Sequence, residues 1–417
     1  MTDPIANIER FNFWRGPLKT GFPRSVYLNR LKKYQSSNLI KVLTGQRRVG
    51  KSYILRQIIS HLISVGVPAK STLYINMEYA EYGFIQDASD LLALVNSFFT
   101  DNDQPAYLFV DEIQNIIGWE KAINSLAQDF TRQIFVYITG SNAQLLSSEL
   151  ATFLSGRYIK FSILPFSFTE YVDMRGEKPN KSNFLQYLGS GGLPELFHLE
   201  DEEAKRQYLS AIYDTVILRD IVQRHQIRDI NLLKDIVAFI ANNISNLLSV
   251  SNLVNYFNNQ KRKTNYETIA QYLLYLEQAY IIHRCERYAI KGKEILSGTA
   301  KYYLNDLSFK NYLYTGYQHG YGYLLENAIY LQLLYHEYEV YVGQLRSGEI
   351  DFVSLKGDQR LYVQSAWSLL DEKTAEREYG PLLSLRDNYQ KVIVTTDDVP
   401  FPNKEGVAHR LAWEDWI

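Results

Sequence analysis

The amino-acid sequence predicts an α/β fold in which a parallel sheet is followed by a helical region and then by a second α/β region. Short apolar strands alternate with helices up to about residue 165, helical periodicity dominates from 166 to 300, and short strands return from 301 to 417. Continuous apolar strands are typical of a parallel sheet covered on both faces. We therefore expect three domains, at residues 1–165, 166–300 and 301–417.

Composition and charge limit the classes of protein to which the chain can belong. Of its 417 residues, 46% are hydrophobic and 22% are charged, which excludes a disordered chain and a coiled-coil rod. No apolar run approaches the roughly 20 residues of a membrane helix, so no membrane contact is expected. Because Cys285 is the single cysteine and the first residues lack a secretory signal, we expect a cytoplasmic protein. With a net charge of -2, any nucleic-acid site must be a local basic patch.

The expected elements of the first domain follow one another as a repeat of strand and helix. Strands are predicted at short apolar runs, and helices where apolar residues recur every three or four positions. The expected strands cover residues 39–44, 72–76, 106–110, 134–139 and 158–162, and the expected helices cover 52–65 and 91–99.

The first expected strand leads into Gly45-Gln-Arg-Arg-Val-Gly-Lys-Ser52, which matches the phosphate-loop pattern G-x-x-x-x-G-K-[ST] in full. The loop lies between a strand and a helix, where backbone N–H groups and the positive helix end can hold phosphates. We expect Lys51 to reach the terminal phosphates of ATP and Ser52 to hold Mg. The expected nucleotide-binding residues are Gly45, Gln46, Arg47, Arg48, Val49, Gly50, Lys51 and Ser52.

Further polar residues are expected to carry out the chemistry on the bound phosphates. Asp111 and Glu112 end the third strand, where an acid lies beside the phosphate loop; Asp111 would hold Mg and Glu112 would polarise the attacking water. A solvated loop is the alternative for this pair. Asn142 can bond the γ-phosphate or the water, or belong to a simple turn. Arg157, expected near the carboxyl edge of the sheet, would stabilise charge during phosphoryl transfer or form a surface salt bridge.

These motifs resemble those of a prokaryotic AAA-type P-loop ATPase family that carries a C-terminal PD-(D/E)xK-like "domain of unknown function 4143". The resemblance covers nearly the whole chain, and its N-terminal half is the specific part. Its further motifs are Phe109-Val-Asp-Glu-Ile-Gln114, Thr139-Gly-Ser-Asn142, Ser155-Gly-Arg-Tyr158 and Leu164-Pro-Phe-Ser-Phe-Thr-Glu-Tyr171.

The resemblance implies an architecture as well as an activity. It implies a P-loop parallel-sheet ATPase domain, a helical lid plus a winged helix, and a C-terminal α/β nuclease-like domain. Gly191-Gly-Leu-Pro-Glu195 resembles the glycine-proline lid element of the family, which implies that Pro194 lies near the nucleotide base. A simple loop between helices is the alternative reading of this segment.

Three expected helices at 232–243, 250–258 and 266–278, followed by a hairpin, form the pattern of a winged helix-turn-helix. From Tyr256 to Lys301 there are eight Lys/Arg and four Asp/Glu, a local charge of +4. Such a face can contact DNA phosphates, although a packing lid or a protein interface is the alternative. The candidate DNA contacts are Lys261, Arg262, Lys263, Arg287 and Lys291.

The C-terminal region follows a nuclease template that needs a helical acid, a strand acid, and Glu-x-Lys on the next strand. Glu326 and Asp351 match the two acids, but Gln364 and Ala366 stand where the template has Glu and Lys. Because the template's lysine activates water and its carboxylates hold magnesium, efficient cleavage is not expected. We expect a degenerate site at Glu326, Asp351 and Gln364 that serves as a binding or assembly surface.

The sequence therefore predicts an ATPase that uses ATP and Mg to rearrange its winged-helix and nuclease-like domains. Its expected partner is DNA, bound through the winged helix, or another protein, and an oligomer is compatible with the sequence. The first alternative is a nucleotide-regulated DNA-binding switch with negligible turnover. The second is an ATP-dependent Mg nuclease.

Overall fold

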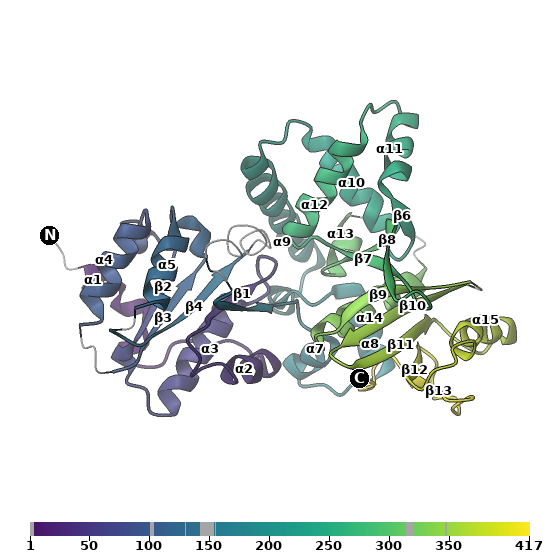
Figure 1. Cartoon of the computed structure of the whole chain (residues 1–417), viewed down its shortest axis with the longest axis horizontal. Coiled ribbons are helices and arrows are strands. Elements are labelled where there is room, and N and C mark those ends of the chain that lie inside the picture. Colours follow the sequence, from purple (N-terminus) through teal and green to yellow (C-terminus); the bar gives the residue numbers. More distant parts are fainter. Residues whose placement is uncertain are drawn as a thin grey trace. The chain divides into compact units, whose positions relative to one another are not determined.

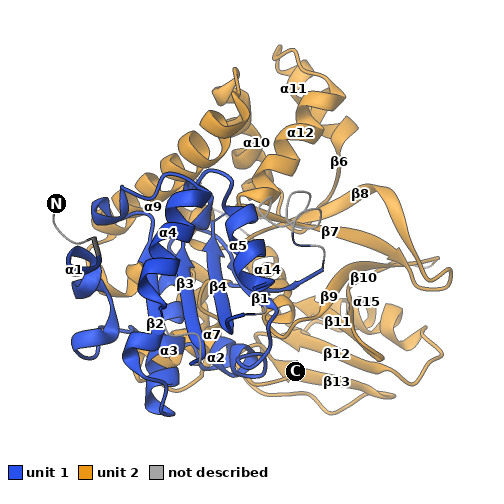
Figure 2. Cartoon of the chain, turned by 60° about the vertical axis from the view of Figure 1, so that its left-hand side comes forward, with its two compact units in different colours: residues 1–163 blue, residues 164–417 orange. Residues whose placement is uncertain are grey.

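The computed structural model describes residues 4–100, 104–129, 131–141, 154, 156–313, 320–346 and 348–417. It divides into two compact units, Met1–Ile163 and Leu164–Ile417, which Figure 2 shows in blue and orange. Each unit contains its own sheet. Among the described residues, no helix has the length and apolar character needed to span a membrane.

Five parallel strands form the sheet of the first unit, in the order β2-β3-β4-β1-β5. Strands β1, β2 and β4 are buried along their whole length, which explains their continuous apolar sequences. The parallel sheet predicted from the sequence is confirmed. The strands are β1 Ile40–Thr44, β2 Thr72–Asn76, β3 Ala106–Asp111, β4 Ile134–Gly140 and β5 Tyr158–Ser162.

Helices cover both faces of this sheet, with α4 and α5 on one side and α2 and α3 on the other (Figure 1). Asp87 caps α4 by accepting hydrogen bonds from the N–H groups of Ser89 and Asp90. Leu91 of α4 and Trp119 of α5 pack in one core with apolar side chains of β1 to β4. The helices are α1 Pro4–Ile8, α2 Ser25–Lys32, α3 Lys51–Ser64, α4 Ala88–Phe98 and α5 Trp119–Ala127.

A mixed sheet of eight strands forms the centre of the second unit, in the order β13-β12-β11-β10-β9-β7-β8-β6. The pairs β7–β9, β11–β12 and β12–β13 are parallel, and the other pairs are antiparallel. The strands are β6 Leu247–Ser249, β7 Ile282–Ala289, β8 Glu294–Leu304, β9 Glu339–Leu345, β10 Gly348–Lys356, β11 Gln359–Ala366, β12 Gln390–Thr395 and β13 Val407–Leu411.

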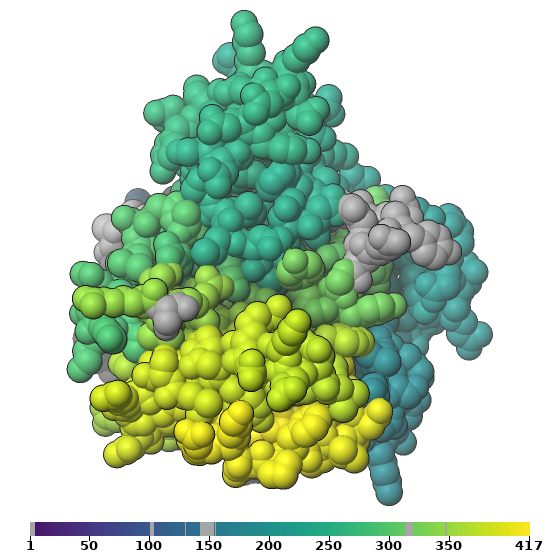
Figure 3. All heavy atoms as spheres, turned by 90° about the vertical axis from the view of Figure 1, so that its right-hand side faces the viewer, coloured from purple at the N-terminus to yellow at the C-terminus, as the bar shows by residue number. Residues whose placement is uncertain are grey.

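The helices of the second unit include the three that the sequence predicted before a hairpin. These are α10 Ile230–Asn242, α11 Val250–Asn259 and α12 Tyr266–Gln278, and β7 and β8 follow them as an antiparallel pair. In Figure 3, atoms of this part of the chain are coloured teal to green and those of the C-terminal residues yellow. The remaining helices are α7 Phe168–Arg175, α8 Lys181–Ser190, α9 Glu202–Asp214, α13 Ser308–Leu313, α14 Tyr321–Tyr335 and α15 Glu372–Leu383.

Two features of the second unit could not be read from periodicity alone. Helix α9 is α-helical to Asp214 and continues as a π-helical stretch, η8, from Thr215 to Gln223. Residue 300, where we expected a domain boundary, lies within β8. The division into three domains stays a prediction, to which the structure adds that one sheet extends across this position.

Candidate functional site

The phosphate loop connects β1 to α3 at the carboxyl edge of the parallel sheet. Gly50, immediately before α3, has a φ of 97°, a conformation that favours glycine. A Cβ on Gly45 would lie 2.2 Å from the carbonyl oxygen of Ile163, so a larger residue would displace the strand end. The buried Arg24, which the sequence did not single out, donates a hydrogen bond to the Val49 carbonyl at 3.0 Å. These contacts define the path of the loop.

Lys51 is buried within the loop and points to its carbonyl groups and to an acid. Its ammonium donates to the carbonyl oxygens of Gly45 at 3.0 Å and Gln46 at 3.1 Å. The same Nζ lies 3.6 Å from Oε1 of Glu112. The structure therefore brings together the loop lysine and the acid that follows β3, as the sequence predicted.

Asp111 is completely buried at the end of β3 and accepts hydrogen bonds from three neighbouring elements. The Tyr74 hydroxyl and the Asn76 amide, both on β2, donate to Oδ2 at 2.9 and 3.0 Å. The Thr139 hydroxyl of β4 donates to Oδ1, and Ser52 of α3 also hydrogen-bonds the carboxylate. The two residues expected to hold Mg, Ser52 and Asp111, are thus in direct contact.

The pKa values of the two adjacent acids, Asp111 and Glu112, are shifted in opposite directions. Burial, followed by the neighbouring Glu112 carboxylate, raises the pKa of Asp111 above its ordinary value. Burial would also raise the pKa of Glu112, but Lys51 and Arg47 together lower it below its ordinary value. Glu112 therefore stays ionised at neutral pH. The negative charge of the buried Asp111 carboxylate, in contrast, is stabilised only when a cation lies beside it. A divalent cation next to Ser52 and Asp111 meets this need, so the residues fit Mg.

Glu112 itself is held in a rare backbone conformation by polar groups from β4. Its φ is 56°, and its N–H donates to the Thr139 hydroxyl at 2.9 Å. Its carboxylate accepts from the amide of Gln114, which lies 3.3 Å from the Ser141 hydroxyl. Strain of this kind often marks functional sites. Gln114, Thr139 and Ser141 were given no role in the expected site, although Gln114 ends one motif of the family resemblance and Thr139 and Ser141 belong to another.

Three other predicted site residues are not placed beside the loop. Arg157 precedes β5, and its carbonyl accepts from the N–H of Ile40, the first residue of β1. Since β1 and β5 are parallel, Arg157 lies at the amino edge, and its expected place at the carboxyl edge was wrong. Asn142 lies outside the described residues. Pro194 begins the short helix η7 (Pro194–His198) in the second unit, and its place near the base stays a prediction.

The candidate DNA contacts belong to two turns of the second unit. Lys261 and Lys263 are exposed between α11 and α12, and Lys291 is exposed in the turn between β7 and β8. Both turns project from the predicted winged-helix region. Their lysines can therefore reach an external polyanion.

The two arginines of this candidate set already have partners within the unit. Arg262 pairs with Asp235, and its second guanidinium nitrogen lies 3.2 Å from Asp229. Arg287 donates a hydrogen bond to the side chain of Gln344 on β9. Because these guanidinium groups are already bound, part of the local +4 charge is neutralised at Arg262, and Arg287 is tied to the sheet.

The three residues of the expected nuclease-like site lie together beside a pocket of about 690 Å³. Glu326 lies on α14, Asp351 on β10 and Gln364 on β11. The Asp351 N–H donates to the Gln364 side chain at 3.2 Å, and the Gln364 amide donates to Glu378 of α15 at 2.7 Å. The predicted grouping thus forms around a neutral amide in the place of the template's acid.

The structure adds an amine that the sequence analysis missed. Lys301 of β8 extends its Nζ to 3.0 Å from Glu326, 2.7 Å from Glu349 and 3.5 Å from Asp351. Ala366 offers no amine at the template's lysine position, and Lys301 brings one to this centre from outside the template positions. The lysine comes from a strand three positions away from β10 in the sheet, so strand-by-strand comparison with a template could not find it.

The sheet order, the complete phosphate loop and the acids after β3 define a P-loop ATPase-like domain of the AAA type. In agreement, the family model described as "AAA domain" matches residues 37–172. A model described as "Domain of unknown function (DUF8612)" matches residues 181–318. This second match differs from the domain 4143 that the sequence motifs suggested. The assignment to domain 4143 therefore stays a prediction.

Two relatives that match most of the chain show its family. It is 37% identical over 382 residues to an uncharacterized protein of Haemophilus influenzae, with 90% of this chain and 94% of that protein covered. It is 31% identical over 385 residues to uncharacterized protein MJ1544 of Methanocaldococcus jannaschii, with 87% and 83% covered. The chain belongs to the family of these two proteins.

Among solved structures, the Walker-type ATPase PABY2304 of Pyrococcus abyssi is similar to the chain with a TM-score of 0.49 and 17% sequence identity. The similarity covers 70% of this chain and 95% of that one.

Proposed function

We propose that the protein binds and hydrolyses ATP with Mg at the loop 45–52. The observation that carries this proposal is the grouping of Lys51, Ser52, Asp111 and Glu112 at one edge of the sheet, with 3.6 Å between Lys51 and Glu112. Mg would be held by Ser52 and Asp111 and would supply positive charge next to the phosphates.

Each residue of the group has a role that follows from its charge and position. The Lys51 ammonium exchanges loop carbonyl oxygens for phosphate oxygens, which are the stronger acceptors because they are charged. Glu112 orients a water and accepts its proton, since its lowered pKa keeps the carboxylate ionised. Thr139 hydrogen-bonds both the Asp111 side chain and the Glu112 backbone, so one hydroxyl positions both acids.

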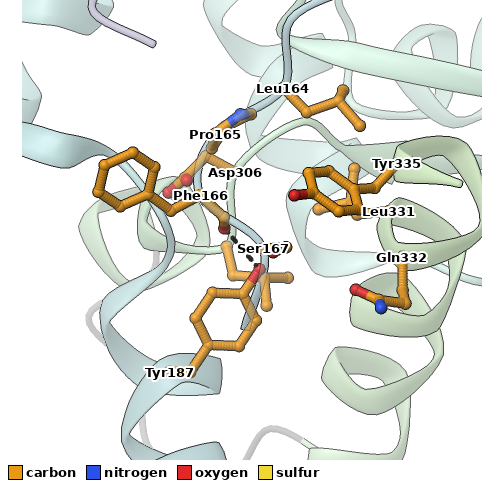
Figure 4. Close-up of a pocket in the computed structure, with 10 residues that line it drawn as sticks. Leu164, Pro165, Phe166, Ser167, Tyr187, Asp306, Leu331, Gln332 and Tyr335 are labelled. Atoms are coloured by element: carbon orange, nitrogen blue, oxygen red, sulfur yellow. Dashed lines mark hydrogen bonds between the residues drawn. The ribbon is translucent and has the colours of Figure 1, made fainter. Parts of the chain in front are cut away.

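We also propose that nucleotide-dependent movement passes into the second unit along the chain itself. The Ile163 N–H donates to the Thr44 carbonyl at 2.6 Å, directly before the phosphate loop. Three residues later, the Phe166 N–H donates a hydrogen bond to the carbonyl oxygen of Gly192 at 2.7 Å. The Tyr187 hydroxyl donates a hydrogen bond to the Phe166 carbonyl oxygen at 3.1 Å (Figure 4). The cavity beside this segment, about 10 Å³, holds at most about one water, so the segment is well packed.

The test is ATP turnover by the purified full chain and two variants. Lys51→Ala should lose most ATP binding, because it removes the buried cation that faces the phosphates. Glu112→Gln should retain binding and lose hydrolysis by about 100-fold or more, the scale of lost general-base catalysis. Binding is measured with a fluorescent ATP analogue and turnover by phosphate release.

Lys70→Ala is the matched control, since Lys70 is an exposed lysine of the same unit that precedes β2. It should behave like the parent in both assays. Unchanged turnover in Glu112→Gln would show that another group polarises the water. Unchanged binding in Lys51→Ala would contradict the nucleotide site itself.

A second candidate function is a nucleotide-regulated DNA-binding switch with negligible turnover. The exposed Lys261, Lys263 and Lys291 favour it, and we propose that α10 to α12 with β7 and β8 form a winged helix that carries them. We further propose that β9 to β13, with α14 and α15, form a nuclease-like domain related to domain 4143. In the ATPase proposal, these two regions are the parts that ATP hydrolysis rearranges, on DNA or on a protein partner.

A further inference from the structure

Four charged side chains from three elements meet in what we call the acid–lysine centre: Lys301 of β8, Glu326 of α14, and Glu349 and Asp351 of β10. The side chains of Lys301 and Glu326 are 6% and 10% exposed. The Tyr303 hydroxyl donates to the same Glu326 oxygen at 2.7 Å. One ammonium is thus surrounded by three carboxylates next to the pocket of about 690 Å³.

An ammonium at this point and a metal ion at this point exclude one another. The Lys301 Nζ lies 2.7 to 3.5 Å from one oxygen of each carboxylate. Divalent cations are bound by carboxylate oxygens at about 2.0–2.6 Å, so small side-chain shifts would let the same three oxygens bind one. Both cations cannot fit within that shell, and their charges repel.

The ammonium is held firmly enough to keep this position. One oxygen of each of the three carboxylates lies within 3.5 Å of the Lys301 Nζ, and the lysine side chain is almost completely buried, so charge and packing together hold the ammonium between the acids.

We propose that the Lys301 ammonium takes the place of a metal ion in the acid–lysine centre, so that the native chain excludes divalent cations there. Removal of the ammonium turns the centre into a cation site with Glu326, Glu349 and Asp351 as ligands and pocket water as the remaining ligands. This inference concerns the second unit alone and does not depend on ATP hydrolysis.

The test compares metal binding by the nucleotide-free full chain and by Lys301→Met, which keeps the length of the side chain but removes its charge. Terbium(III) is the probe, because the Tyr303 phenol beside Glu326 can sensitise its luminescence. We expect Lys301→Met to bind terbium, and manganese in competition, with a Kd on the order of 10⁻⁴ M or tighter. The parent should show no terbium signal that Asp351→Asn removes.

Two further variants separate charge from structure. Lys301→Arg keeps the cation and should stay without the signal. Lys301→Met combined with Asp351→Asn removes one ligand and should bind at least about 10-fold more weakly than Lys301→Met. Melting of Lys301→Met should shift upward with calcium, while the parent should not change.

Two results would overturn the proposal directly. One is a signal in the parent that Asp351→Asn removes, which would mean that metal binds with the lysine present. The other is a folded Lys301→Met without the signal. If Lys301→Met folds neither alone nor in millimolar calcium, the proposal also fails, because the ion should replace the missing charge.

Discussion

Asp306 links the turn before η7 to the end of β8 within the second unit. Its Oδ2 accepts the Gly192 N–H at 2.8 Å, and its Oδ1 accepts the Ser308 N–H at 2.9 Å as well as the Ser308 hydroxyl. A Cβ on Gly192 would lie 2.2 Å from the Phe166 carbonyl oxygen, so the turn has no space for a side chain there. One carboxylate therefore ties together segments that are more than 100 residues apart in the sequence.

The stability contributed by Asp306 should depend on pH. Burial raises its pKa to about 6, above the value of about 3.9 of an unfolded chain. Between these values the folded state binds more protons than the unfolded state, so the free energy of unfolding falls as pH rises from about 4 to 6. The whole change is on the order of 2–3 kcal/mol.

Urea unfolding of the parent and of Asp306→Asn at several pH values measures this effect. The stability of the parent relative to the variant should decrease from pH 4 to pH 6 and then stay constant. A difference that is the same at all pH values would show that the carboxyl group titrates normally in the fold.

At the scale of elements, the turn between α11 and α12 combines a structural cation with two exposed ones. Arg262 bridges Asp229 and Asp235 on the neighbouring α10 region, whereas Lys261 and Lys263 face outwards. A surface pair such as that of Arg262 contributes at most about 1 kcal/mol to stability. The three consecutive basic residues therefore do not form one uniform DNA-binding patch.

Neutralising the two lysines should weaken DNA binding more than removing the arginine. In Lys261→Ala/Lys263→Ala, the slope of log K against log salt should fall by about 0.9 per lost phosphate contact, about 1.8 in total. Arg262→Ala should lower stability slightly and leave the slope nearly unchanged. Fluorescence anisotropy with duplex DNA from low to moderate salt measures these slopes.

Lys33→Ala/Lys178→Ala removes the same charge from two exposed lysines outside the turn and serves as the control. An equal fall of the salt slope in this control would show that the effect comes from the net charge of the protein and not from this turn. No binding by the parent at low salt would mean that α10 to α12 with β7 and β8 serve as a lid or a protein interface instead.

At the scale of the whole molecule, a phosphate loop and a pocket lined by acids belong to one chain, but only the phosphate loop has the charged groups that its expected chemistry needs. The first unit presents a lysine, a hydroxyl and two acids at one edge. In the second unit, Gln364 donates to Glu378 in place of a metal-binding acid, and Lys301 is retained by three carboxylates. A lysine that stays protonated cannot deprotonate water.

The intact chain should therefore not cut DNA at the pocket. We expect the parent to cut no more DNA than the Asp351→Ala variant does. The test incubates each protein with linear, nicked and single-stranded DNA in the presence of ATP and either magnesium or manganese. Cleavage that copurifies with the parent and disappears in Asp351→Ala would contradict this expectation and would also require a metal beside Lys301.

Local patterns were sufficient for the parallel sheet and for most of the phosphate site. Strand, loop and helix follow one another directly around Gly45 and Lys51, and Asp111 comes directly after a buried strand. In a parallel sheet the carboxyl ends of all strands share one edge, so the sequence alone brings these residues together. The order of three helices and a hairpin in the second unit was likewise visible in the periodicity.

Other features depended on contacts between residues that are distant in the sequence. Arg157 lies before its strand rather than after it, so the pairing of β5 with β1 put it at the opposite edge from the loop. Arg262 reads as a free cation until folding brings Asp235 to it, and Lys301 reads as an ordinary strand residue until β10 and α14 surround it. Local order and strand direction follow from the chain itself, whereas the partner of a charged group is chosen by packing.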